Sequence, residues 1–493
     1  MNLAHLPINV IFSSVLFAFS MMLIKNLRVK NILIFLFSIA ILYSCYLLYN
    51  LSINNVIYYN FGSWGSELGV QFVINKITTF FYIICCIPFA ISLSFLSFDK
   101  KHSVIPFMLI NFSGLIGMVF SYDLFNTYIF LEVSSIASYI IITNRNNLKS
   151  LKASIDYLIV GSVAGVLILI GIAIAYHVFG SLNYLIIGKR VVEISPSSYQ
   201  QLLIYSSACL IIIGFLIKIG IYPLHNWMLK SYSVADRFIL PFLVPVSSKI
   251  SFLCLIKIIF VVFKLSILQV QLSYLIDLLQ IISNVSIIVV SIIMLFEESL
   301  KKIIIFSSIL QSTYYIIAAS IVDYSLFQFV FISILFDGLV KSSILTIIDW
   351  VEMKKNRQLT IRDINVALTD CRINKMFFVF LILANAGLPV SIAFIFKIQF
   401  IYSLFQSNMF LTIALFVFST IITIHYSIRI IESTIDSTEI DSSSEDGLID
   451  KSSGLSHYFI NSLIALISCI TLLSIYFSEF IVEFTKNCSY EIF

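Results

Sequence analysis

The chain has 493 residues, of which 60% are hydrophobic and only 11% are charged, and its formal net charge is +4. Soluble domains are about 45–50% apolar and about 25% charged, so a chain this long and this apolar cannot cover its surface in water. The composition predicts an all-α polytopic membrane protein. The thinly spread basic residues form no stripe, which argues against nucleic-acid binding.

Apolar runs of about 20 residues, the length that crosses the hydrocarbon core, divide the chain into transmembrane helices. We expect about 14 of them. Their approximate ranges are 8–24, 31–50, 79–98, 104–121, 123–143, 155–179, 200–222, 238–263, 272–296, 303–321, 324–350, 376–402, 408–431 and 458–482. The first run lacks a basic start and a small-residue cleavage site, so it is interpreted as a span rather than a signal peptide.

Lysine and arginine in the loops predict the orientation of these spans. Alternate loops, beginning with the one after the first span, hold 20 of the basic residues, whereas the opposite loops and tail hold five. Since basic loops face the cytoplasm, both termini are expected on the non-cytoplasmic side of a cell membrane. The acidic, serine-rich stretch 432–451 is expected to be a solvated cytoplasmic loop.

Glycine and proline interrupt two of the predicted spans. The seventh ends within the stretch 214–227, which holds Pro223 and His225, and the twelfth contains the stretch 385–397 with Pro389. Proline removes a backbone donor, and the freed groups are tolerated inside a membrane only beside protein or a wet cavity. Matched broken helices in two halves of a chain favour a transporter site.

The two breaks occupy the same place if spans 4–8 and 9–13 are five-helix repeats. Because five is odd, the second repeat enters the membrane from the opposite side, so the repeats are inverted. The predicted division is a three-helix segment, residues 1–103, then repeats 104–264 and 265–431, and finally the acidic loop with the last helix, 432–493.

Five lysines lie inside predicted spans, where a charge costs about 2.5–3.5 kcal/mol or more to insert. They are Lys218, Lys249, Lys257, Lys341 and Lys397. Two carboxylates, Glu132 and Asp337, also lie within apolar runs. Burial disfavours the charged form of an amine, and a nearby carboxylate favours it, so such pairs suit proton transfer.

Structural interpretations of these charges remain open. Lys257 is close enough to the end of its helix to reach the membrane surface by snorkelling. The other four lie deeper and form either structural ion pairs or an ion pathway. The sequence does not indicate which lysine Glu132 faces. The eight scattered cysteines have no metal-type spacing, so no metal or cofactor is expected, and they are interpreted as buried apolar residues.

Five segments together resemble the proton-conducting subunits shared by Mrp-type cation/proton antiporters and respiratory complex I. They are Asp123 to Tyr139, Leu151 to Asn183, "KIGIYPLHNW" from Lys218, "SLKKIIIFSSILQSTYY" from Ser299, and "GLPVSIAFIFK" ending at Lys397. The segment "GSWGSELGVQFV" from Gly62 looks more like the D-type antiporter proteins than like the complex I versions. Several packing positions differ from the family pattern, including Phe336 where a histidine is common.

The resemblance implies a proton-translocation series. Glu132 and Lys218 would form the pair of the first half, and Lys249 would link it to Lys341, the central lysine of the second half. Lys397 would lie on the exit side. Asp337, His225, Pro223 and Pro389 would support the series.

Three functions remain open. The first is a D-like subunit of a multisubunit Na⁺(K⁺)/H⁺ antiporter, with other membrane subunits as partners. The second is a proton-pumping subunit of complex I, which would be part of an NADH:quinone oxidoreductase without redox centres of its own. The third is a non-conducting structural subunit of such a complex.

Overall fold

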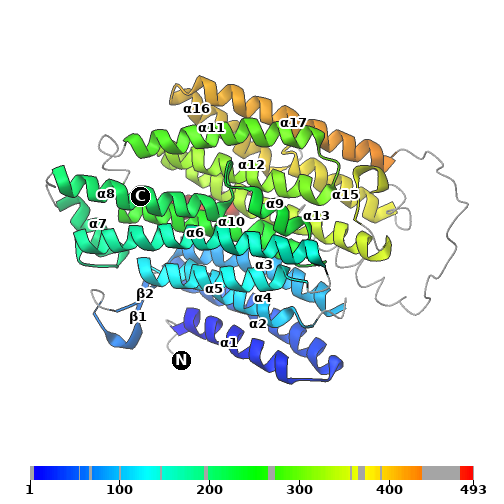
Figure 1. Cartoon of the computed structure of the whole chain (residues 1–493), viewed down its shortest axis with the longest axis horizontal. Coiled ribbons are helices and arrows are strands. Elements are labelled where there is room, and N and C mark those ends of the chain that lie inside the picture. The colour runs from blue at the N-terminus through cyan, green and yellow to red at the C-terminus, as the bar shows by residue number, and fades with distance from the viewer. Residues whose placement is uncertain are drawn as a thin grey trace, which may run out of the picture.

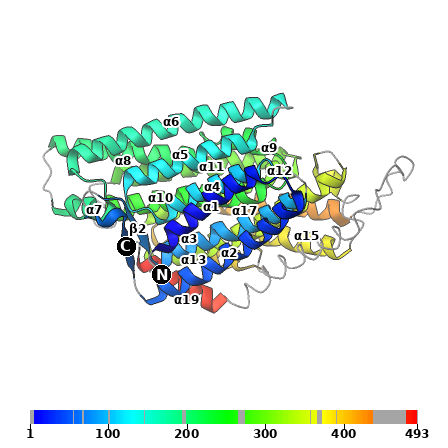
Figure 2. The same ribbon diagram turned by 90° about the horizontal axis from the view of Figure 1, so that it is seen from below.

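The computed structural model describes residues 5–54, 56–65, 69–98, 102–144, 147–193, 198–264, 273–355, 358–364, 372–388, 391–435 and 478–491. Within these ranges the chain is a bundle of helices that run side by side along its long axis (Figures 1 and 2). Eleven described helices are long and apolar enough to cross a membrane. The prediction of an all-α polytopic membrane protein is confirmed.

The helices follow the apolar runs closely, since each run must satisfy its backbone polar groups internally. The longer helices are α1 (Leu6–Leu23), α2 (Leu27–Asn54), α3 (Lys76–Phe98), α4 (Ile105–Phe120), α5 (Leu124–Ile142), α6 (Leu148–Phe179), α8 (Ser198–Ile219), α10 (Leu240–Ile256), α11 (Ser273–Phe296), α12 (Leu300–Ile321), α13 (Tyr324–Lys355) and α17 (Phe410–Ile435). The shorter ones are α7 (Tyr184–Glu193), α9 (Asn226–Ser233), α15 (Arg372–Asn385), α16 (Ile392–Gln406) and α19 (Ser478–Tyr490).

Both predicted helix breaks are confirmed. Helix α8 covers the seventh predicted span, 200–222, up to Ile219, and an irregular turn and then α9 follow it. The twelfth, predicted as one run over 376–402, is instead two helices, α15 and α16, separated by a turn at Ala386 and Gly387. Pro389, most of the stretch 432–451 and most of the last predicted span lie outside the described residues.

One arrangement of helices occurs in both halves of the chain. In each half a 32-residue helix, α6 or α13, precedes and packs on the broken helix. In the first half α6 packs on α8, and in the second half α13 packs on both α15 and α16. The domain boundaries proposed from the sequence stay a prediction.

One end of the bundle carries a small hairpin and α7. Strand β1 (Ile57–Asn60) pairs antiparallel with β2 (Gln71–Ile74), with Ile57 opposite Ile74. Figures 1 and 2 both place this hairpin, α7, the start of α1 and the end of α19 at the same end of the molecule. There Ile77 donates its backbone N–H to the Glu491 carboxylate at 3.1 Å, which ties α19 to the start of α3.

Helix α10 continues directly into a π-helical segment, η3 (Lys257–Val262), which the sequence did not predict. Lys257, expected to reach the membrane surface, is instead 1% exposed, so that expectation is wrong. Its amine donates to the carbonyl of Val119 at 2.5 Å and to that of Ser121 at 3.4 Å, at the end of α4. The last carbonyls of a helix have no intrahelical donor, so a lysine amine satisfies them there.

Candidate functional site

In the first half, a lysine and a glutamate from different helices meet inside the bundle. Lys218, in the last turn of α8, lies 3.7 Å from Glu132 of α5, measured between Nζ and Oε1. The Lys218 amine donates to Ser135 Oγ at 2.8 Å. Glu132, Ser135 and Tyr139 are spaced to lie on one face of α5, and this face meets the lysine. The Lys218 side chain is 6% exposed and that of Glu132 is 24% exposed.

Two glycines of α6 make room for this pair. A Cβ atom on Gly165 would lie 2.3 Å from Glu132 Oε1, and one on Gly161 would lie 1.9 Å from the Tyr139 hydroxyl. Both distances are far below a normal van der Waals contact. The absence of side chains at these two positions therefore allows the carboxylate and the phenol to project between α5 and α6.

We predict that Gly165→Ala will displace the Glu132 carboxylate from Lys218. A displacement of about 1 Å at a reacting group costs up to about 100-fold in rate, so the proton transport that the family resemblance implies should fall by about 10- to 100-fold. Transport is measured as proton flux into vesicles per assembled protein. Gly338→Ala is the matched control, because a Cβ there has a nearest neighbour at 3.9 Å and is expected to change little. Equal flux in the two variants would contradict the prediction.

The break after Lys218 is stabilised by side chains from α9. The Trp227 indole N–H donates to the carbonyl of Ile217 at 3.0 Å, which satisfies a group near the end of α8. His225 is 2% exposed, and its ring lies 6.3 Å from that of Phe306 on α12. Its Nδ1 has no hydrogen-bond partner among the described residues. His225 thus lies where α8, α9 and the second half of the chain approach one another.

In the centre of the molecule one aspartate joins two lysines. Asp337 of α13 lies 3.0 Å from the amine of Lys249 on α10 and 2.5 Å from that of Lys341, one turn further along α13. Both lysines are 0% exposed. Lys249 also donates to Ser308 Oγ of α12 at 2.9 Å. When all three groups are ionised, this central triad carries a net charge of +1 in a buried site.

A further set of hydrogen-bonded polar side chains lies near the central triad, on α12 and α13. The Tyr315 hydroxyl and Ser333 Oγ lie 3.0 Å apart, and Gln311 donates to Ser333 at 2.7 Å. Ser333 lies one turn before Asp337, and the Lys249 amine is 6.0 Å from the centre of the Tyr315 ring. A buried polar network of this kind provides groups that accept and donate protons within the membrane.

At the second break, Lys397 reaches back across the gap between α15 and α16. Its amine donates to the carbonyl of Ala386 at 2.5 Å. The neighbouring Asn385 donates to the Tyr426 hydroxyl of α17 at 2.8 Å. In the part of the chain that the structure describes, no carboxylate lies within ion-pair distance of Lys397. The backbone of the break therefore takes the place of an acidic partner.

Comparison with known proteins identifies the family to which the chain belongs. The family described as "NADH:quinone oxidoreductase/Mrp antiporter, TM" matches residues 121–423, well over half of the chain and every member of the predicted lysine series. The chain belongs to this family. The resemblance drawn from the sequence motifs is confirmed.

Relatives of this antiporter and oxidoreductase family include both kinds of protein. The N subunit of the NADH-quinone oxidoreductase of Desulforudis audaxviator is 26% identical over 320 residues, covering 65% of this chain and 62% of that one. The D subunit of the Na(+)/H(+) antiporter of Alkalihalophilus pseudofirmus is 28% identical over 176 residues, covering 35% of each. The chain thus matches less than two thirds of the length of these relatives.

Two solved structures share the fold of this family member. A chain of the Mrp complex from Dietzia sp. aligns with a TM-score of 0.86 and 16% identity, covering 100% of this chain and 98% of that one. A chain of respiratory complex I from Thermus thermophilus aligns with a TM-score of 0.75 and 13% identity, covering 97% and 98%. At these identities the likeness establishes the fold alone.

The structure separates the predicted site residues of this family member into three groups. Glu132 and Lys218 form the first, the Lys249–Asp337–Lys341 triad forms the second, and Lys397 with the Ala386 carbonyl at the second break forms the third. Among the described residues no hydrogen bond or ion pair links one group to the next. The sequence also failed to reveal a further buried cluster, in which Lys301, interpreted as a loop residue, contacts Asp349 and Glu352. The spacing of Asp349 and Glu352, three residues apart at the end of an apolar run, is the feature of the sequence that could have indicated this cluster.

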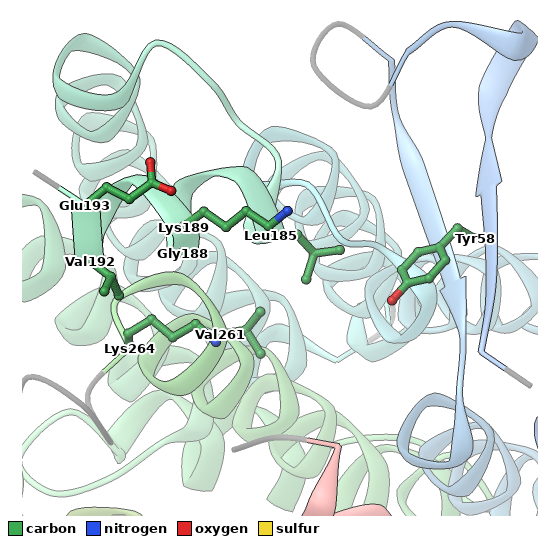
Figure 3. A pocket seen from close by; sticks show the side chains of 8 residues that line it. All are labelled: Tyr58, Leu185, Gly188, Lys189, Val192, Glu193, Val261 and Lys264. Carbon is green, nitrogen blue, oxygen red and sulfur yellow. The ribbon is translucent and has the colours of Figure 1, made fainter.

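A cavity of about 520 Å³ lies at the end of the bundle that carries α7. Figure 3 shows Lys189 and Glu193 of α7, Lys264 after η3 and Tyr58 of β1 around it. None of its lining residues belongs to the predicted lysine series. The cavity and the buried charges are therefore separate features of this chain.

Proposed function

We propose that the chain is a proton- and cation-translocating, D-like membrane subunit of a multisubunit Na⁺(K⁺)/H⁺ antiporter. Its partners would be the other membrane subunits of that complex, and its ions would be H⁺ with Na⁺ or K⁺. It would lie in the cell membrane with both termini on the non-cytoplasmic side, as the distribution of basic residues in the loops predicts.

The observation that supports transport is the set of buried charges beside broken helices. Four lysines of the series, Lys218, Lys249, Lys341 and Lys397, retain amines inside the bundle at a high insertion cost. Three of them lie within ion-pair distance of a carboxylate: Lys218 pairs with Glu132, and Lys249 and Lys341 both pair with Asp337. Each helix break lies next to the first or last lysine of the series. Such groups can hold and release protons one after another without exposing charge to lipid.

In the proposed mechanism, the charge on one group controls the proton on the next. A proton bound at Glu132 removes the negative charge 3.7 Å from Lys218, which favours loss of a proton from that amine. In the central triad, Asp337 can stabilise a positive charge on Lys249 or on Lys341, so a proton can be exchanged around one fixed anion. Partner subunits would couple these steps to cation movement.

A proton-pumping subunit of complex I is the second candidate. The match to the oxidoreductase N subunit covers 65% of the chain, a longer stretch than the match to the antiporter protein from Alkalihalophilus pseudofirmus. The segment Gly62 to Val73, which looks more like the D-type antiporter proteins, favours the antiporter. A subunit that only supports assembly is the third candidate, since buried ion pairs also occur without transport.

The test is an ion-driven transport assay on everted membrane vesicles that contain the chain with its co-purifying subunits. For an antiporter, adding Na⁺ or K⁺ is expected to dissipate a preformed proton gradient, as read by a pH-sensitive dye. Vesicles from cells that lack the chain are the control. Proton uptake that requires NADH and quinone, and no response to either cation, would instead support the complex I function. No proton movement in either assay would leave the structural role.

A further inference from the structure

A buried ion cluster lies at the end of the bundle where α12 begins and α13 ends. The Lys301 amine is 2.6 Å from Asp349 Oδ1 and 2.5 Å from Glu352 Oε2. The three side chains are 6%, 0% and 6% exposed, respectively. By the basic-residue count this end faces the cytoplasm. We refer to Lys301, Asp349 and Glu352 as the end cluster.

The charges of the end cluster do not balance. One cation faces two carboxylates, so the fully ionised cluster carries a net charge of −1 in a buried site. Backbone groups supply two more donors, from Phe238 to Asp349 at 2.7 Å and from Leu359 to Glu352 at 3.1 Å. Leaving one buried charge uncompensated is costly, and a single added proton makes the cluster neutral. The end cluster therefore has a place for one proton.

Two hydroxyl-bearing residues of α13 lie between the end cluster and Lys341. Asp349 and Lys341 are eight residues apart, which is about 12 Å along a helix. Thr346 and Ser342 lie between them, one and two turns from Asp349 on the same face, and the Thr346 hydroxyl donates to the Ser342 backbone carbonyl at 2.7 Å. The end cluster lies on α12 and α13, and Phe238, which donates to it, is two residues before α10. The same three helices carry Lys249, Ser308 and Asp337 at the central triad.

Two buried hydroxyls in this region lack a partner. Ser342 Oγ on α13 and Ser248 Oγ on α10 make no hydrogen bond to any described residue, and these side chains are 0% and 1% exposed. Helices α10 and α13 pack against each other. Buried hydroxyls without partners are uncommon in folded proteins, and ordered water commonly satisfies them. These hydroxyls, each one residue from a lysine of the central triad in sequence, are therefore candidate sites for bound water.

We propose that the end cluster is the proton-exchange site of the second half, and that water held by Ser342 and Ser248 connects it to Lys341. This inference rests on the proposed transport function. A proton from the aqueous side binds to a carboxylate oxygen of Glu352, and the cluster changes from −1 to neutral. The proton then passes through water held by the Ser342 and Ser248 hydroxyls to the uncharged amine of Lys341, and the cluster returns to −1.

Ser342→Ala tests the connection, with Ser343→Ala as its matched control. The Ser342 hydroxyl has no partner among the described residues, so a purely structural role predicts no loss on its removal. The relay predicts transport slower by about fivefold, the rate equivalent of one lost hydrogen bond. The Ser343 hydroxyl is already bonded to the Leu339 carbonyl at 2.7 Å, so its removal should leave transport unchanged. Equal flux in the two variants would overturn the inference.

Glu352→Gln tests the exchange site itself. The amide keeps the shape and an acceptor for Leu359, but it cannot bind the transported proton, so flux should fall to the background of empty vesicles. Glu297→Gln is the control. It removes the ion pair between Glu297 and Lys302 at the start of α12, whose side chains are more exposed than those of the end cluster. Flux equal to that of the unmodified chain in Glu352→Gln would overturn the inference.

An infrared measurement separates failure of this inference from failure of the proposed function. The purified chain with its partners should show a carboxylic-acid C=O band that shifts in D₂O and disappears in Glu352→Gln. The band does not require that transport occurs. If vesicles transport protons but no such band is found, the end cluster is not the exchange site. If the band is present and Ser342→Ala slows transport, both parts of the inference hold.

Discussion

Replacing Lys218 by methionine is expected to reduce proton flux to the level of empty vesicles while the protein still assembles. Methionine fills a similar volume without a charge, so the end of α8 should keep its packing. The Glu132 side chain left behind is 24% exposed and does not become a fully buried, unpaired anion. Flux is measured in vesicles with a pH-sensitive dye and divided by the amount of assembled protein.

Lys257→Met is the matched control for Lys218→Met. Lys257 is equally buried, but its amine donates to the Val119 and Ser121 carbonyls and contacts no carboxylate among the described residues. Its loss should lower the free energy of unfolding by about 1.5–3 kcal/mol, the contribution of hydrogen bonds from a charged donor. Proton flux per assembled protein should persist. Normal flux in Lys218→Met, or equal loss in both variants, would refute a specific role for Lys218.

The second large effect is expected from Asp337→Asn, which removes the only carboxylate of the central triad. Lys249 and Lys341, both 0% exposed, would then be two buried amines without an anion among the residues that the structure describes. Breaking a buried pair in this way costs about 3–5 kcal/mol, so assembled protein should be strongly reduced. Yield after membrane extraction and the thermal unfolding midpoint measure the effect.

A control and a double variant test this explanation of Asp337. Asp156→Asn breaks the ion pair between Asp156 and Lys230, whose side chains are 32% and 62% exposed, and should change stability by no more than about 1 kcal/mol. Adding Lys341→Met to Asp337→Asn removes one unpaired amine, so it should recover much of the lost stability but no proton flux. A double variant as unstable as Asp337→Asn would contradict the ion-pair explanation.

The composition of the site was largely predictable from the sequence. Charged residues are conspicuous within runs of isoleucine, leucine and phenylalanine, because each carries an insertion cost that lipid does not repay. The two helix breaks were equally evident, since proline and glycine disrupt a helix wherever they lie. For these reasons the lysines of the series and Glu132 and Asp337 could be selected without a structure.

Which charged side chains pair with one another was less predictable from the sequence. The pairing of Glu132 with Lys218 came from the resemblance to a family, because hydropathy does not indicate which helix faces which. The i, i+4 spacing of Asp337 and Lys341 was visible in the chain, but the approach of Lys249 from another helix was not. Lys257 and Lys301 were misinterpreted as surface residues, because their positions near helix ends allow either burial or exposure.

The sequence by itself determined that this chain crosses a membrane many times, that Lys218, Lys249, Lys341 and Asp337 lie in the interior, and where two helices break. Those properties depend on the order of residues along one chain and on the cost of placing them in lipid. Only the tertiary structure decided that one aspartate serves two lysines, and that Lys301 joins Asp349 and Glu352. Contacts between helices depend on how each helix is rotated about its axis and how deep it lies in the bundle. The packing of side chains from all the helices determines this rotation and depth.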